Sequence, residues 1–134
     1  MRIMSVDLGK ARIGIAVGDS DTKVGSPRPV LRGLGSLQKD AEQVFRLGES
    51  EEVEAFVVGV PKGLEDSGQQ RICERFAGIL RELGALVYEV DESMTSLEAE
   101  SLLIETGMKA SGRRRLVDSG AARIILERFF EEHA

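Results

Sequence analysis

The sequence is poor in the residues from which many catalytic sites are built. It contains one cysteine and one histidine, Cys73 and His133, in 134 residues. A single cysteine excludes an internal disulfide and a cysteine-based zinc site. A lone histidine beside the last residue argues against a Ser-His-Asp or Cys-His triad and against a histidine-ligated metal. Any enzyme chemistry must therefore rest on carboxylates, lysine and arginine.

Other features are scarce as well. The chain has no tryptophan and only 4% aromatic residues, which argues against stacking of bases on aromatic side chains and favours contacts to a nucleic-acid backbone. No apolar run approaches ~18 residues, so we expect no membrane span. A carboxylate already at Asp7 argues against a signal peptide.

What is present is typical of a soluble globular protein, with 42% hydrophobic and 31% charged residues. The length predicts a single domain over residues 1–134. The net charge is −5, but both ends are basic: residues 1–35 carry six basic and three acidic side chains, and residues 109–134 carry six and four. A polyanion could dock if the two ends share one face. Equally, the acidic middle could simply keep the protein in solution.

Hydrophobic patterns predict an α/β fold. Residues 2–8 and 12–18 read as an antiparallel hairpin, and residues 23–30 as a third strand that Pro27 and Pro29 confine to a sheet edge. Residues 26–35 are the weakest stretch and could be a mobile loop. The remaining elements alternate: helix 36–48, strand 55–60, helix 69–83, strand 85–90, helix 95–105 and a last helix from near 118 to 132. We therefore predict a mixed five-stranded sheet, three strands antiparallel and the others parallel, flanked by helices.

Acidic residues stand at the ends of two predicted strands. Asp7 ends the first strand, where a carboxylate among apolar residues is costly without a partner or a metal, unless it merely caps the turn. Asp91 and Glu92 follow the strand 85–90. Successive strand residues point to opposite faces, so only one of these two can join a shared site. Both could instead belong to the turn and the start of the next helix.

Asp118 heads an apolar stripe. Ala122, Ile125 and Phe129 follow it at helical spacing, so Asp118 tops a buried face. The alternative is an N-cap, but an N-cap needs no inward stripe, and we favour a functional role. If Asp7, Glu92 and Asp118 converge, their repulsion requires cations, and oxygen ligands select Mg²⁺ or Mn²⁺. Two such ions can hydrolyse a phosphodiester without a histidine base.

Basic residues accompany these acids. Four of them precede Asp118 within seven residues, where they are placed to hold phosphates: Lys109, Arg113, Arg114 and Arg115. The alternative is a solvated basic loop. Lys10 and Arg12 follow Asp7 closely and, together with Arg28, form a second candidate binding surface.

Four motifs, in order, are similar to those of one family. Residues 7–16 resemble an Asp-x-Gly followed by Arg-Ile-Gly-x-Ala, and residues 57–61 resemble a central strand with a Gly-x-Pro turn. Residues 90–95 resemble an Asp-Glu-Arg-x-Thr/Ser segment, and residues 115–126 a closing Val-Asp-x-x-Ala-Ala-x-x-Ile-Leu helix. Over nearly its whole length the sequence resembles the YqgF/RuvX family of RNase H-like proteins.

This resemblance implies an RNase H-like fold, a cytoplasmic bacterial protein, and a Mg²⁺- or Mn²⁺-dependent endonuclease that matures the 5′ end of pre-16S rRNA. Its catalytic and metal-binding residues would be Asp7, Glu92 and Asp118, with Asp91 as the alternative to Glu92. The substrate-binding residues would be Lys10, Arg12, Arg113, Arg114 and Arg115. Ser93 stands where the family usually has arginine, so one phosphate contact is in doubt.

Three other functions remain open. The family is related to Holliday-junction resolvases, and cleavage of branched DNA would need two symmetric sites and hence a homodimer rather than a monomer. A non-catalytic ribosome-assembly or nucleic-acid-binding factor is a further alternative, against which the three intact acids argue. Sugar kinases and actin-like ATPases share the first hairpin, but they need a second domain.

Overall fold

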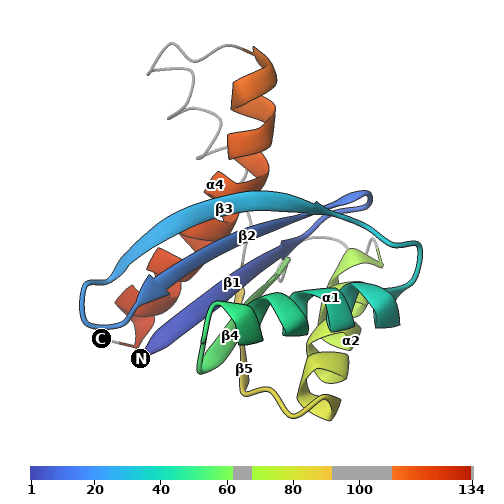
Figure 1. Ribbon diagram of the computed structural model, residues 1–134, viewed down its shortest axis with the longest axis horizontal. Helices are drawn as coiled ribbons and strands as arrows, with labels where there is room; N and C mark the ends of the chain where they lie inside the picture. The colour runs from blue at the N-terminus through green and yellow to red at the C-terminus, as the bar shows by residue number, and fades with distance from the viewer. Residues whose placement is uncertain (62–67, 92–109, 134) are drawn as a thin grey trace.

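A mixed β-sheet forms the middle layer of the computed structural model (Figure 1). The structure describes residues 1–61, 68–91 and 110–133, with side chains from residue 120 onward in the last range. The strands in these ranges are β1 (Arg2–Leu8), β2 (Arg12–Asp19), β3 (Val24–Arg32), β4 (Ala55–Val60) and β5 (Val87–Asp91). The helices in these ranges are α1 (Leu37–Ser50), α2 (Gln69–Glu82) and α4 (Ala110–Glu132).

The strand pairing confirms the predicted sheet. The order in the sheet is β3-β2-β1-β4-β5. β1 pairs antiparallel with β2, and β2 with β3, while β1–β4 and β4–β5 are parallel. Every residue of β4 is buried, as expected for a central strand covered on both faces. β3 is an edge strand, so Pro27 and Pro29 interrupt no further ladder.

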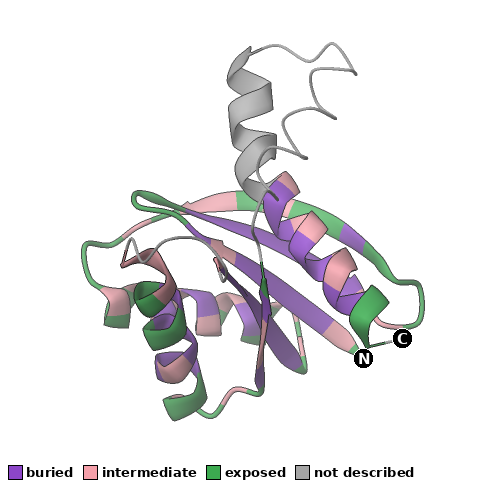
Figure 2. Cartoon of the chain, turned by 180° about the vertical axis from the view of Figure 1, so that it is seen from behind, coloured by how far each residue is buried: buried purple, intermediate pink, exposed green. Residues whose placement is uncertain are grey.

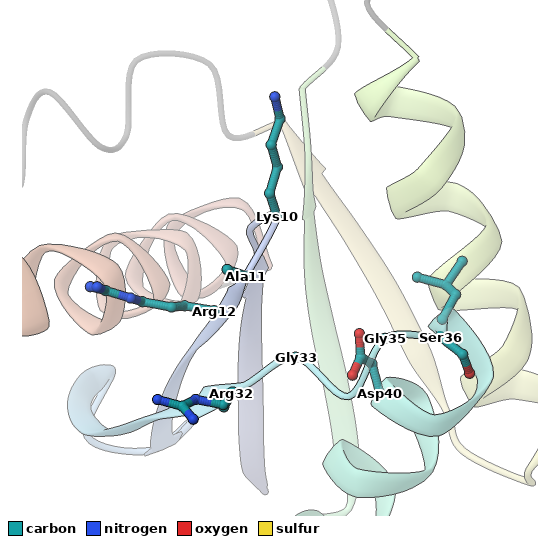
Figure 3. Close-up of a pocket in the computed structure, with 9 residues that line it drawn as sticks. Lys10, Ala11, Arg12, Arg32, Gly33, Gly35, Ser36 and Asp40 are labelled. Atoms are coloured by element: carbon teal, nitrogen blue, oxygen red, sulfur yellow. The ribbon is translucent and has the colours of Figure 1, made fainter.

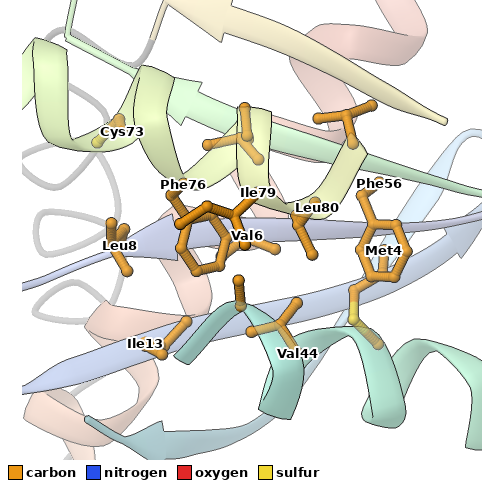
Figure 4. Packing of buried hydrophobic residues seen from close by; sticks show 14 of the residues in the cluster. Met4, Val6, Leu8, Ile13, Val44, Phe56, Cys73, Phe76, Ile79 and Leu80 are labelled. Carbon is orange, nitrogen blue, oxygen red and sulfur yellow. The ribbon is translucent and has the colours of Figure 1, made fainter. Parts of the chain in front are cut away.

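Each face of the sheet carries its own apolar core. On one face α1 and α2 cover side chains that include Met4, Val6 and Phe56 (Figure 4). The buried Cys73 of α2 belongs to this core. We call this the α1/α2 core.

The opposite face packs against α4 (Figure 2). Ala16 of β2 and Val57 of β4 lie there against Ala122, Ile125 and other apolar residues of α4. β2 thus presents bulky side chains to the α1/α2 core and small residues to α4. We call this second cluster the α4 core.

Several element boundaries differ from the predictions by one or two residues, and those of β3 and β5 have a clear structural reason. β3 continues to Arg32, so most of the suspected loop is strand, because it pairs with β2 along its length. β5 begins at Val87 rather than at residue 85. There the backbone N–H of Ala85 donates to the carbonyl of Leu80, which closes the end of α2, and Leu86 is exposed.

The last helix begins at residue 110, eight residues before the predicted start. The sequence of the added turns offers no apolar stripe for hydrophobic periodicity to detect, but it contains good helix formers such as alanine, arginine and leucine. The predicted helix 95–105 lies outside the described residues. Within the described ranges, no helix has the length and apolar composition needed to cross a bilayer.

Candidate active site

Asp7 lies at the end of β1 on the face that α4 covers. Alternation along β1 sends Met4, Val6 and Leu8 into the α1/α2 core, and Ile3 into the α4 core. Asp7 therefore shares its face with Ile3, and it is half-buried. Its partner across the ladder is Gly14 of β2. A half-buried carboxylate thus stands next to the last residue of β1, directly after four buried residues.

A buried hydrogen bond ties this strand to the last helix. The hydroxyl of Ser5 donates to the backbone carbonyl of Ala122, 117 residues later in the chain. Ser5 is fully buried. The bond fixes the position of α4 along β1, and the sequence patterns did not single out Ser5.

A second contact sets the direction of α4. Gly18 pairs with Ile3 across the ladder, and a side chain added at Gly18 would meet Leu126 at 3.1 Å. Two residues further along β1, Ser5 meets Ala122, which is four residues earlier in α4. Two strand residues span ~6.7 Å and one helical turn ~5.4 Å, so the two contacts are spaced similarly along both elements. α4 therefore runs antiparallel to β1.

Asp118 lies inside α4, one turn before Ala122, where its backbone is helical. The N-cap alternative is therefore wrong, because the helix begins eight residues earlier. The three arginines at 113–115 also lie in this helix, so the alternative of a basic loop is wrong for them. The side chains of these four residues, and Lys109 as a whole, lie outside the described residues.

β5 settles the place of Asp91. Tyr88 and Val90 join the α4 core, while Val87 lies in the α1/α2 core and Glu89 pairs with Arg81 of α2 at 3.3 Å. Alternation therefore puts Asp91, the last residue of β5, on the face away from α4. Its carbonyl accepts a hydrogen bond from Arg128 Nη1 at 2.8 Å. Glu92 and Ser93 lie outside the described residues.

α2 supports the end of β1 from the other side. The side-chain amide of Gln69, the first residue of α2, donates to the carbonyl of Leu8 at 2.9 Å. Leu8 directly follows Asp7, so this contact holds the backbone beside the carboxylate. Nothing in the sequence pattern marked Gln69, since its partner is 61 residues away.

The first hairpin turn opens onto a pocket of about 690 Å³ (Figure 3). Lys10 and Arg12, two of the predicted substrate-binding residues, line it together with Arg32 at the end of β3. The opposite wall comes from the first turn of α1, including Asp40. The structure therefore brings Lys10 and Arg12 together and adds an arginine that sequence patterns missed.

Two carboxyl groups with a lowered pKa lie at the far end of β1 from Asp7. Arg28 and Arg2 form ion pairs with Glu51 at 2.6 and 2.8 Å, and hydrogen bonding from Arg28 is the main cause that lowers the pKa of Glu51. The backbone N–H of Asp21 is the main cause that lowers the pKa of Asp19. These groups stabilise the sheet and take no part in the candidate site.

Among the described side chains, no three of histidine, cysteine, aspartate and glutamate gather closely enough to hold a metal ion. Two of the three predicted ligands, Glu92 and Asp118, fall outside that set. Asp7 offers the hard oxygen donors that Mg²⁺ and Mn²⁺ prefer, and its half-buried position at a strand end suits a ligand.

Sequence comparison finds one family over the whole length of the chain. The sequence model described as "RuvX: Holliday junction resolvase" matches residues 1–132. A protein of Natranaerobius thermophilus named "Putative pre-16S rRNA nuclease" is 36% identical, over 98% of this chain and 94% of its own length. A protein of the same name from Pelotomaculum thermopropionicum is 37% identical, over 98% of this chain and 87% of its own.

Solved structures share the fold. RuvC of T. thermophilus, in complex with a Holliday junction, superposes with a TM-score of 0.61 at 17% identity, over 99% of this chain and 95% of that one. The Fowlpox virus resolvase, also bound to Holliday junction DNA, gives 0.59 at 15% identity, over 99% of both chains. At these identities the likeness concerns the fold, which is the RNase H-like fold predicted from the sequence.

Proposed function

The chain belongs to the RuvX family, and from this we propose that it is a divalent-metal-dependent endonuclease that processes the 5′ end of pre-16S rRNA in the cytoplasm. The relatives that share its length and about a third of its residues carry that substrate in their name. The structural observation that carries the proposal is the half-buried Asp7 at the end of β1, on the face covered by α4.

The register between β1 and α4 supports a meeting of Asp7 with Asp118. Ile3 lies level with Leu126, through its ladder partner Gly18, and Ser5 contacts Ala122. Each two residues along β1 correspond to four residues back along α4. Extending this spacing from Ser5 and Ala122 places Asp7 level with Asp118. We propose that these two carboxylates belong to one site.

Strand alternation supports Glu92 as the third member. Tyr88 and Val90 face α4 and Asp91 faces away. If the alternation of β5 continues by one residue, Glu92 returns to the side of Asp7. This favours Glu92 over Asp91, and three carboxylates from β1, the end of β5 and α4 form the proposed site.

Such a set fits Mg²⁺ or Mn²⁺, because all its donors are carboxylate oxygens. A bound pair of these ions would supply an activated water and stabilise the leaving oxygen of a phosphodiester. Asp7, Glu92 and Asp118 would hold the ions, Gln69 and Ser5 keep β1 and α4 in place, and the basic residues would neutralise the phosphates beside the cleaved bond. In the hydrolysis the water oxygen bonds to phosphorus as the P–O bond to the leaving oxygen breaks, and one proton of the water passes through solvent to the leaving oxygen.

The proposal is tested with purified protein on an RNA that spans the 5′ end of 16S rRNA, with Mg²⁺ and Mn²⁺ titrated separately. We expect metal-dependent cleavage that Asp7→Asn abolishes. Asp21→Asn is the matched control, since Asp21 is exposed and lies at the far end of the hairpin. Cleavage by Asp7→Asn at the wild-type rate would overturn the proposal, and binding without cleavage by any form would favour a non-catalytic assembly factor.

The description of the family model favours one second candidate, the resolution of four-way DNA junctions. This reaction makes paired cuts and needs two copies of the site related by symmetry. A four-way junction is therefore included as substrate, and the mass of the active protein is measured in solution. Symmetric junction cleavage by a dimer, with the RNA left intact, would replace RNA processing by this function.

A further inference from the structure

Arg12 and Arg32 face each other directly across the β2–β3 ladder. Both are exposed. Like charges at directly opposite positions repel and destabilise a sheet. A local arrangement that costs stability without an evident gain is the kind expected where a chain binds something, and here that ligand would carry negative charge.

The surroundings of this pair are also basic. Lys10 lines the same pocket, and within the described part of the chain neither Lys10 nor Arg32 forms an ion pair. The one carboxylate in the lining, Asp40, accepts a hydrogen bond from the backbone N–H of Leu34 at 2.7 Å. The pocket therefore holds three cations and one anion that is already engaged with the loop.

The loop behind Arg32 is held in place. The backbone N–H of Gly33 donates to the carbonyl of Ala11 in the hairpin turn at 2.9 Å. Gly35 has a φ of +85°, which favours glycine and lets the chain turn into α1. This bond and the bond from Leu34 to Asp40 fix the wall of the pocket before any ligand arrives.

Arg12 lies close to Asp7 in the sheet. The ladder partner of Asp7 is Gly14, and Arg12 lies two residues from Gly14 along β2, a backbone distance of ~7 Å. Ile13 lies in the α1/α2 core and Leu31 packs against it, so Arg12 and Arg32 project on the same side of the sheet as Asp7. Figure 3 shows their side chains extending in the same direction from neighbouring strands.

We propose that Arg32, with Lys10 and Arg12, binds a backbone phosphate of the same nucleic-acid strand that passes Asp7, next to the phosphate to be cleaved. This inference rests on the proposed function and adds to it a subsite that positions the substrate. A phosphate contact fixes the register of a strand but carries no sequence information. The subsite therefore contributes affinity on every sequence alike.

The test uses the full chain carrying Asp7→Asn, so that the substrate binds without being cut. Binding of labelled RNA precursor and of a four-way junction is measured between about 50 and 200 mM salt, where each phosphate contact contributes ~0.7–0.9 to the slope of log affinity against log salt. Arg32→Gln should lower the slope by about that amount and weaken binding to all sequences equally. Arg32→Lys should keep the slope.

Arg46→Gln is the matched control. Arg46 is also an arginine, its side chain is 76% exposed, and it forms an ion pair with Glu42 of the same helix at 3.9 Å. It should keep the slope of the parent. An Arg32→Gln slope equal to that of Arg46→Gln would overturn the inference and leave the proposed function intact, whereas a parent that binds neither substrate would overturn the proposed function itself.

Two further readouts separate the subsite from other roles. The urea midpoint of Arg32→Gln should equal or exceed that of the parent, because a like-charge pair is removed; a lower midpoint together with an unchanged slope would assign Arg32 to the fold. The same three basic residues could instead bind a small phosphate compound, and competition by inorganic phosphate tests this alternative. If Arg32→Gln weakens competition by millimolar phosphate but leaves the oligonucleotide slope unchanged, the pocket takes a small phosphate compound and the inference fails.

Discussion

The same substitution at two helical glycines should have opposite effects on stability. Gly48 lies in α1 and Gly78 in α2, both inside their helices. A Cβ at Gly48 would stand 2.3 Å from Cζ and 2.8 Å from Cε1 of Phe56, whereas a Cβ at Gly78 would meet nothing within 4 Å. Comparing the two sites therefore separates two contributions to the free energy of unfolding: the preference of a helix for alanine over glycine, and the cost of overpacking.

The first contribution, the preference of a helix for alanine over glycine, is favourable at both sites. Alanine in place of glycine inside a helix stabilises the folded state by ~0.5–1 kcal/mol. At Gly78 this is the whole effect, so Gly78→Ala should gain that amount. At Gly48 the ring of Phe56, which is 4% exposed and stacks on Phe45 at 6.3 Å, must shift. Overpacking of this kind costs ~1–3 kcal/mol, so Gly48→Ala should be less stable than Gly78→Ala by about that amount.

Urea unfolding followed by circular dichroism measures both free energies of unfolding, with a thermal midpoint difference of roughly 4 °C per kcal/mol as a second readout. Adding Phe56→Leu to Gly48→Ala should recover part of the loss, since the two sites are in contact and their effects are not additive. Equal stability of the two alanine variants would refute the close packing of α1 on β4.

Three other outcomes follow from the contacts above. Ser5→Ala removes the buried hydrogen bond to Ala122 and should lower the free energy of unfolding by ~1 kcal/mol, measured by urea unfolding; no loss would mean that this bond does not anchor α4. The pKa of Glu51 is lowered in the folded state mainly by Arg28, so its contribution is present above its ordinary value near 4.5 and is lost as the pH falls below it. Glu51→Gln should therefore lose less stability than the wild type between about pH 6 and 3, and parallel curves would contradict this. Replacement of the three arginines at 113–115 by alanine should weaken nucleic-acid binding on all sequences and flatten the salt slope by up to ~3, and an unchanged slope would leave the pocket beside Lys10 as the main binding surface.

The strand directions were predictable because the sequence carries both of their determinants. Residues 13, 15 and 17 alternate with small residues, which indicates a strand with two unlike faces, and residues 55–60 are apolar throughout, which indicates a central parallel strand. Strands joined by short turns should pair antiparallel, and strands separated by helices should pair parallel. The four pairings have these directions. The place of Asp7 at a strand end followed from the same pattern.

Two kinds of feature were not predictable: those that depend on strand register, and helical turns whose sequence lacks an apolar stripe. The sequence of α4 before residue 118 contains no regular apolar stripe, so hydrophobic periodicity could not detect these turns. Arg32 gains its meaning only from standing opposite Arg12, which requires the register of β3 on β2. Ser5 and Gln69 act on partners 117 and 61 residues away, and no local pattern marks such contacts. The choice between Asp91 and Glu92 likewise needed the alternation observed in β5.

The separation of the two cores has a consequence for how the chain opens in its native state. Apart from the strands that both cores share, the α4 core consists of α4 residues, while the α1/α2 core keeps its own apolar side chains on the other face. α4 can therefore detach as one cooperative unit while the sheet stays folded on α1 and α2. Its amides should exchange hydrogen through an opening of lower free energy than those of β1 and β4. Because α4 carries Asp118, each such opening would dismantle the proposed site long before the protein unfolds, and inactivation by heat should precede the loss of the sheet.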